Sequence, residues 1–123
     1  MTLAQKQQAF AVLVARLILE IDKRGWKVTF GEAYRGPIEA ARLAKLGKGI
    51  ARSLHTERRA IDLNLFKNGV YQDQSEAYAP LGFWWKEQSL PGLECAWGGD
   101  FKDSRGRPKP DGNHFSVEHE GRK

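Results

Sequence analysis

The chain has 123 residues, which predicts one domain with a modest core. Hydrophobic residues make up 41% of it and charged residues 28%, and no apolar run approaches the roughly 20 residues that span a bilayer, which argues against membrane insertion. The net charge of +5 favours an anionic partner, and the single cysteine, Cys95, excludes an internal disulfide.

An apolar stripe with helical spacing opens the chain. Its members recur at i, i+3, i+4, i+7, i+8 and i+11, and they are Phe10, Leu13, Val14, Leu17, Ile18 and Ile21. Thr2 and Gln5 form a predicted capping box at the start of this helix, and Gly25 is its predicted stop.

Two shorter elements follow. The segment WKVTF alternates the apolar Trp26, Val28 and Phe30 with polar residues, the period of a half-buried strand. Next, Pro37 occupies a predicted first helical position and Gly47 a predicted C-cap, so the residues between them are expected to form a short helix.

The second half of the chain mixes strands, turns and a helix. AIDLNLF reads as a strand, and Asn68-Gly69 supplies a hairpin turn to a partner strand. SEAYAPLGFWWKEQSL is predicted helical, AWGGD a turn, DSRGRPKPDGN a polar loop and HFSVEH a last short strand. Together these elements predict an α+β fold over residues 1–123, with helices packed on a small antiparallel sheet in a single compact domain.

One acid interrupts the apolar strand AIDLNLF. Alternation places Asp62 and Asn64 on the face opposite Ile61, Leu63 and Leu65, which are expected to face the core. A buried carboxylate is costly unless it is paired or binds a metal, so Asp62 needs a partner.

Two histidines and a second acid offer one solution. His55 precedes the strand, and Asp111 lies three residues before His114 at the start of the last strand. Two imidazoles and a carboxylate can bind catalytic zinc, with a further carboxylate as general base. Other readings of the same residues stay open: Asp62 pairs with Arg58 or Arg59, and Asp111 is a turn residue before Gly112. His119 lies an odd number of residues after His114, which places it on the opposite face of a continuous strand.

The stretch SLHTERRAIDL resembles the metal motif of the zinc D-alanyl-D-alanine carboxypeptidases and L-alanyl-D-glutamate endopeptidases, the VanY-like peptidases that include phage endolysins. Their pattern, Ser-x-His-x-x-Gly-x-Ala-x-Asp, matches at Ser53, His55, Ala60 and Asp62. Arg58 stands where the family has glycine, a departure that concerns the local backbone.

The family's second motif is an acid, two residues and a histidine, usually before an aromatic residue. DGNHF matches it at Asp111, His114 and Phe115. WGGDF resembles the stretch that precedes this motif in phage members, and EAYR resembles the segment that carries the family's arginine, here Arg35. The resemblance covers about residues 26–117.

The resemblance implies a zinc-dependent peptidoglycan peptidase of the phage or prophage endolysin type, which cuts the L-alanyl-D-glutamate bond of the stem peptide. The implied zinc ligands are His55, Asp62 and His114. Asp111 is then the general base, Arg35 contacts the scissile carbonyl, and Ser53 binds substrate or holds the His55 loop.

Several alternatives share these features. A D-alanyl-D-alanine carboxypeptidase carries the same motifs, and an inactive cell-wall-binding module of the same fold has no use for Asp111. A nucleic-acid binder is disfavoured because the basic residues are dispersed and no recognised motif is present. We expect a monomer made in the cytoplasm, since MTLAQKQQAF does not read as a signal peptide. Holin-mediated release or cell breakage would then bring it to the cell wall.

Overall fold

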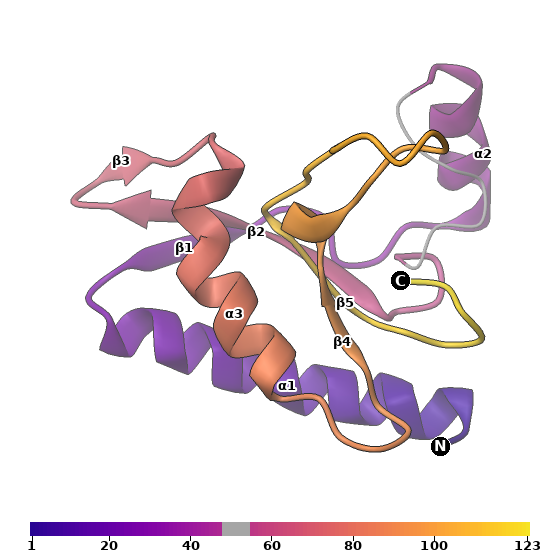
Figure 1. Ribbon diagram of the computed structural model, residues 1–123, viewed down its shortest axis with the longest axis horizontal. Coiled ribbons are helices and arrows are strands. Elements are labelled where there is room, and N and C mark those ends of the chain that lie inside the picture. The colour runs from indigo at the N-terminus through magenta and orange to yellow at the C-terminus, as the bar shows by residue number, and fades with distance from the viewer. Residues whose placement is uncertain (48–54) are drawn as a thin grey trace.

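The computed structural model describes residues 1–47 and 55–123 (Figure 1). The helices are α1 (Leu3–Lys23), α2 (Pro37–Lys45) and α3 (Ala79–Glu87), with short 3-10 helices η1 (Ser75–Tyr78) and η2 (Gly98–Asp100). The strands are β1 (Lys27–Phe30), β2 (Ala60–Lys67), β3 (Val70–Tyr71), β4 (Cys95–Trp97) and β5 (His114–Val117).

The five described strands form one antiparallel sheet, which confirms the predicted α+β class. Its order is β1-β2-β5-β4, and β3 pairs with β2 beyond the end of β5. The long strand β2 is therefore central, and it pairs with β5 in a register that sets Asp62 opposite His114.

Helix α1 follows the sequence prediction at both ends. The Thr2 side chain accepts a hydrogen bond from the Gln5 backbone, and the Gln5 side chain accepts one from the Thr2 backbone, which completes the capping box. Gly25 has φ +81°, the left-handed conformation that ends a helix at little cost for glycine. The buried residues of α1 lie on its apolar stripe, except for Lys6, whose ammonium donates to the Glu118 carbonyl.

The Asn-Gly hairpin is also confirmed. Asn68 has φ +52° and Gly69 has φ +77°, and the flanking Lys67 and Val70 are paired. Positive φ at both central residues is the signature of a type I′ turn, whose twist matches that of the two strands.

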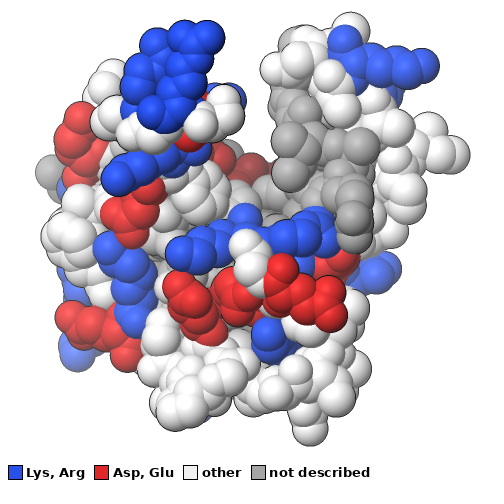
Figure 2. Space-filling model, turned by 45° about the vertical axis from the view of Figure 1, so that its right-hand side comes forward, with Lys and Arg blue, Asp and Glu red and all other residues white. Residues whose placement is uncertain are grey.

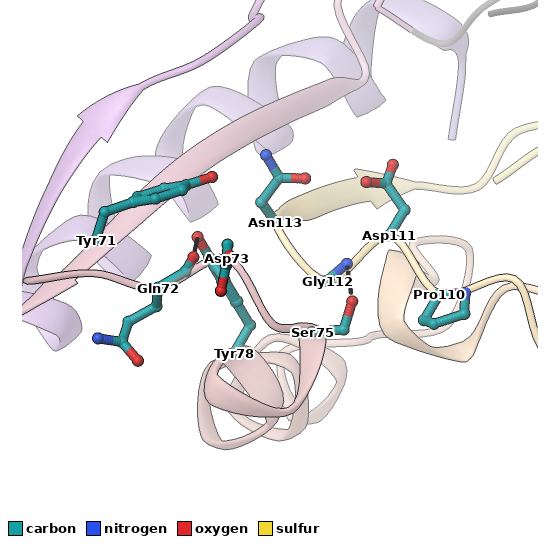
Figure 3. A pocket seen from close by; sticks show the side chains of 9 residues that line it. All are labelled: Tyr71, Gln72, Asp73, Ser75, Tyr78, Pro110, Asp111, Gly112 and Asn113. Carbon is teal, nitrogen blue, oxygen red and sulfur yellow. Dashed lines mark hydrogen bonds between the residues drawn. The ribbon is translucent and has the colours of Figure 1, made fainter. Parts of the chain in front are cut away.

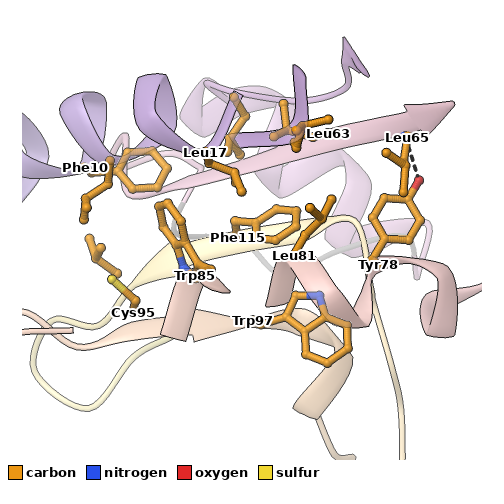
Figure 4. Packing of buried hydrophobic residues seen from close by; sticks show 14 of the residues in the cluster. Phe10, Leu17, Leu63, Leu65, Tyr78, Leu81, Trp85, Cys95, Trp97 and Phe115 are labelled. Carbon is orange, nitrogen blue, oxygen red and sulfur yellow. Dashed lines mark hydrogen bonds between the residues drawn. The ribbon is translucent and has the colours of Figure 1, made fainter. Parts of the chain in front are cut away.

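The core fills the space between one face of the sheet and the helices α1 and α3 (Figure 4). Leu63 and Leu65 of β2 and Phe115 of β5 are fully buried there. Trp85 of α3 packs edge-on against Phe115 and donates its indole N–H to the Ser116 carbonyl. Because alternate residues of a strand point to opposite faces, Asp62 and His114 lie on the face away from these helices.

Two sequence predictions are corrected. AWGGD is not a turn throughout, because Cys95–Trp97 forms strand β4 and pairs with β5, a partner that lies about twenty residues further along the chain. Phe30, expected on the buried side of its strand, is 68% exposed. It stands at the end of the edge strand β1 and lines an open groove beside α1.

Candidate metal and catalytic site

Sheet pairing brings two of the predicted ligands together. Asp62 and His114 are directly opposite each other on β2 and β5, and their side chains share the sheet face away from the core. His55 reaches the same place from the loop before β2. Its backbone carbonyl accepts hydrogen bonds from the Arg35 and Arg58 backbone N–H groups, which fixes that loop beside the sheet.

The three side chains form a compact cluster. Asp62 Oδ1 lies 3.5 Å from His55 Nε2 and 3.4 Å from His114 Nδ1. One ligand atom from each residue lies within 4.8 Å of the other two, so His55, Asp62 and His114 form a group that can hold a metal ion. The two imidazoles are nearly perpendicular, at 82°.

The cluster fits a small divalent cation. Zinc bonds of about 2.0–2.2 Å in a tetrahedral site place neighbouring ligand atoms roughly 3.3–3.6 Å apart, close to the two separations involving Asp62. Asp62 Oδ1 is buried and forms no hydrogen bond within residues 1–47 and 55–123, a costly state that a metal ion would relieve. His55 Nδ1 lies 3.4 Å from the Ala33 carbonyl, an arrangement that directs its Nε2 toward Asp62.

The same geometry controls the charge of the cluster. Burial raises the pKa of Asp62, but the close contacts with the imidazoles of His114 and His55 outweigh burial and lower the pKa to about 2. Asp62 is therefore an anion at neutral pH, the form in which a carboxylate binds metal.

Asp111 stands beside the cluster. Its Oδ2 lies 3.9 Å from His114 Nδ1, and its side chain is 56% exposed. Desolvation and the negative charge of Asp62 raise the pKa of Asp111 above its ordinary value. A solvent-accessible carboxylate of increased basicity next to a candidate metal site has the properties of a proton acceptor.

Glycines allow the loop that carries Asp111 to pack closely. The Asp111 N–H donates to the Gly98 carbonyl at 2.9 Å, and a Cβ on Gly98 would lie 2.0 Å from the Asp111 carbonyl oxygen. The next residue, Gly112, donates its N–H to Ser75 Oγ and accepts from Trp97 Nε1. No local sequence pattern indicates the need for these glycines, because the contacts that require them come from distant segments.

A small polar cavity of about 180 Å³ adjoins this loop (Figure 3). It lies between the segment that links β3 to η1 and the loop before β5. Its lining residues are Tyr71, Gln72, Asp73, Ser75, Tyr78, Pro110, Asp111, Gly112 and Asn113. The Asp111 carboxylate thus stands between the histidine cluster and a recess lined by hydrogen-bonding groups.

Arg35 is nearby but not exposed. Its side chain is 10% exposed, and its Nε and Nη2 donate to the two carboxylate oxygens of Glu32 at 2.6 and 2.5 Å. The hydrogen bonds with Arg35 lower the pKa of Glu32, and the same bonds raise that of Arg35. Glu32 was not singled out from the sequence, although the (i, i+3) spacing of an acid and an arginine was a usable signal.

The two arginines considered as partners of Asp62 have other contacts. The Arg58 guanidinium lies 4.2 Å from the centre of the Tyr34 ring. Arg59 is fully buried and donates to the Glu57 carboxylate and the Val117 carbonyl. Arg58 also has φ +54°, so the position where the resembled motif has glycine adopts the conformation that glycine favours.

Ser53 lies outside the described residues. His119 follows β5 and has its Nε2 3.7 Å from Glu120, and it is not among the described residues that group around Asp62.

Charge is distributed over the surface. On the face shown in Figure 2, Lys and Arg side chains are interspersed with Asp and Glu side chains, and no continuous basic surface is visible. Among the described helices, none combines the length and apolar content that crossing a bilayer requires.

Comparison with solved structures identifies the fold. The chain is similar to the crystal structure of the Serratia marcescens L-Ala D-Glu endopeptidase ChiX, with a TM-score of 0.63 and 22% sequence identity. The match covers 88% of this chain and 79% of the other. No family model and no curated protein sequence matches this chain. The chain therefore has the fold of this L-Ala D-Glu endopeptidase structure, and its candidate metal cluster lies on the sheet face away from the core helices.

Proposed function

We propose that this protein is a zinc-dependent peptidoglycan peptidase that cleaves the L-alanyl-D-glutamate bond of the stem peptide. The observation that carries the proposal is the grouping of His55, Asp62 and His114, with Asp111 beside them. Similarity to an L-Ala D-Glu endopeptidase structure supports the choice of substrate.

Zinc is the proposed ion, because two imidazoles and one carboxylate with an open fourth position form a common catalytic zinc set. When bound by His55, Asp62 and His114, zinc lowers the pKa of a coordinated water toward about 7 and polarises an amide carbonyl. Asp62 contributes one negative charge, and His55 is oriented by the Ala33 carbonyl.

The remaining steps belong to the chain's own side chains. Asp111 accepts a proton from the attacking water and later gives it to the leaving amine, a role that suits its exposure and raised pKa. Arg35 donates hydrogen bonds to the oxygen of the scissile carbonyl as negative charge develops there. The cavity next to Asp111 offers polar contacts to the stem peptide.

A phage or prophage origin forms part of the proposal. Its support is the likeness of WGGDF and of the aspartate at position 111 to phage members of the VanY-like peptidases. In the structure, Gly98 within WGGDF contacts the backbone of Asp111, so the two segments pack directly against each other.

Digestion of purified peptidoglycan tests the function. The zinc-loaded protein is expected to release stem peptides that begin with D-glutamate, detected by mass spectrometry, and the chelator-treated protein is expected to release none. Free D-alanine as the sole product would identify a carboxypeptidase instead. If the protein binds peptidoglycan at verified zinc occupancy but releases no product, it is a cell-wall-binding module and not a peptidase.

A further inference from the structure

The segment of residues 31–35 is attached to two of the candidate metal ligands. The Gly31 N–H donates to the Asp62 carbonyl at 2.8 Å, and the Asp62 N–H donates to the Glu32 carbonyl at 2.7 Å. The Arg35 N–H donates to the His55 carbonyl at 3.2 Å. The backbone on either side of the Glu32–Arg35 pair is therefore fixed relative to the cluster.

The hydrogen bonds between the two side chains leave part of the guanidinium available. Arginine has five N–H groups, and Glu32 accepts one from Nε and one from Nη2. Three remain, two on Nη1 and one on Nη2, and within residues 1–47 and 55–123 no further side-chain hydrogen bond of Arg35 is present. Glu32 thus binds the edge of the guanidinium formed by Nε and Nη2. The end formed by Nη1 and Nη2 keeps one N–H on each nitrogen that can donate to an oxygen atom.

A second glutamate–arginine pair in the chain has the same geometry but a different exposure to solvent. Glu39 and Arg42 have the same (i, i+3) spacing and the same two-bond contact, at 2.9 and 2.6 Å. Their side chains are 48% and 58% exposed, whereas Glu32 and Arg35 are 30% and 10% exposed. An exposed pair is solvated and contributes little, while a guanidinium that is largely shielded from solvent and held on one edge loses its freedom to rotate.

We propose that Glu32 is a positioning residue that holds the Arg35 guanidinium with its free end toward the scissile carbonyl, an inference that rests on the proposed peptidase function. Glu32 itself does not touch the substrate. Its carboxylate removes the alternative rotamers of Arg35 before substrate binds, so that the donors are in place when charge develops on the carbonyl oxygen.

NMR of the full-length protein tests the positioning without any turnover. The Nε–H signal of Arg35 is assigned by its loss in Arg35→Lys. It is expected to exchange slowly with water in the wild type and in Glu39→Gln, and to exchange rapidly in Glu32→Gln, whose amide cannot accept both bonds. Equal exchange in wild type and Glu32→Gln would overturn the inference and leave the proposed function untouched.

A double-mutant cycle tests the catalytic consequence at verified zinc occupancy. Glu32→Gln is expected to lower kcat about 10- to 100-fold with little change in KM, the size of effect that misplacing a catalytic group produces. In an Arg35→Ala background the same change is expected to alter kcat less than about twofold, since Glu32 acts only through Arg35. Glu39→Gln, the matched control, is expected to keep the wild-type kcat.

Other results would contradict the inference in recognisable ways. An equal loss from Glu32→Gln with and without Arg35 would show that Glu32 acts independently, and an unchanged kcat would show that it does not act at all. A zinc-loaded wild type that releases no product would overturn the proposed function, and with it the catalytic role of the pair, whatever the NMR shows.

Discussion

Trp97 joins the core to the loop that carries Asp111, and Trp97→Phe tests this connection. The indole fills the space next to Gly82, where an added Cβ would lie 2.1 Å from the ring, and its Nε1 donates to the buried Gly112 carbonyl at 2.7 Å. Losing the donor costs about 1–3 kcal/mol, because the carbonyl stays buried without this bond. The smaller ring leaves a cavity that adds roughly 1 kcal/mol.

We therefore expect Trp97→Phe to lower the free energy of unfolding by about 2–4 kcal/mol. A chain of this length has a total stability of roughly 6–18 kcal/mol, so the variant is expected to fold. The assay is urea unfolding of the metal-free protein in chelator, which removes the contribution of bound metal. The matched control is Trp84→Phe, a partly buried position on α3 whose indole N–H has no hydrogen-bond partner among the described residues.

For Trp84→Phe we expect a loss below about 1 kcal/mol, the range of a partly exposed substitution. Equal losses in the two variants would show that the Trp97–Gly112 hydrogen bond contributes nothing specific. A Trp97→Phe protein as stable as wild type would refute the reasoning.

Three further predictions concern the site and the thiol. Asp111→Asn is expected to keep its zinc and lose about 10²- to 10⁴-fold in the rate of peptidoglycan clearing, the usual contribution of a positioned general base. Metal analysis is expected to find about one zinc per chain, lost in His114→Ala and kept in His119→Ala; the reverse pattern would refute the ligand assignment. Burial raises the pKa of the Cys95 thiol to about 11, so iodoacetamide at pH 8 is expected to alkylate it slowly in the folded protein and quickly in denaturant.

Two outcomes for the Asp111→Asn variant would contradict the role assigned to Asp111. If Asp111→Asn loses zinc together with activity, Asp111 is itself a ligand and the role of Asp62 must be revised. If it clears cell wall at the wild-type rate, another acid is the base, with Asp100 and Glu118 as the next candidates. In the structure Asp100 forms an ion pair with Lys86, and Glu118 accepts from the Gly121 N–H, so each already has a partner.

Several local features of this protein can be predicted from its sequence. The capping box of Thr2, the stripe of α1 and the Asn68-Gly69 turn depend on residues within a few positions of one another, so their patterns are visible without the fold. It also assigned Asp62 to the polar face of its strand, because side chains in a strand alternate strictly. The resemblance of two short motifs was enough to group His55, Asp62 and His114 as candidate ligands, and the structure brings the three together.

The contacts between distant segments follow only from the folded structure. The register that sets Asp62 opposite His114 joins residues 52 positions apart, and strand β4 exists because β5 is there to pair with it. The close packing that requires glycine at position 98 comes from the Asp111 loop, which no local pattern reveals. The partner of Arg35 is a further example. Arg35 forms hydrogen bonds with Glu32, and the fold leaves its side chain only 10% exposed, which cannot be predicted from the spacing of two charges.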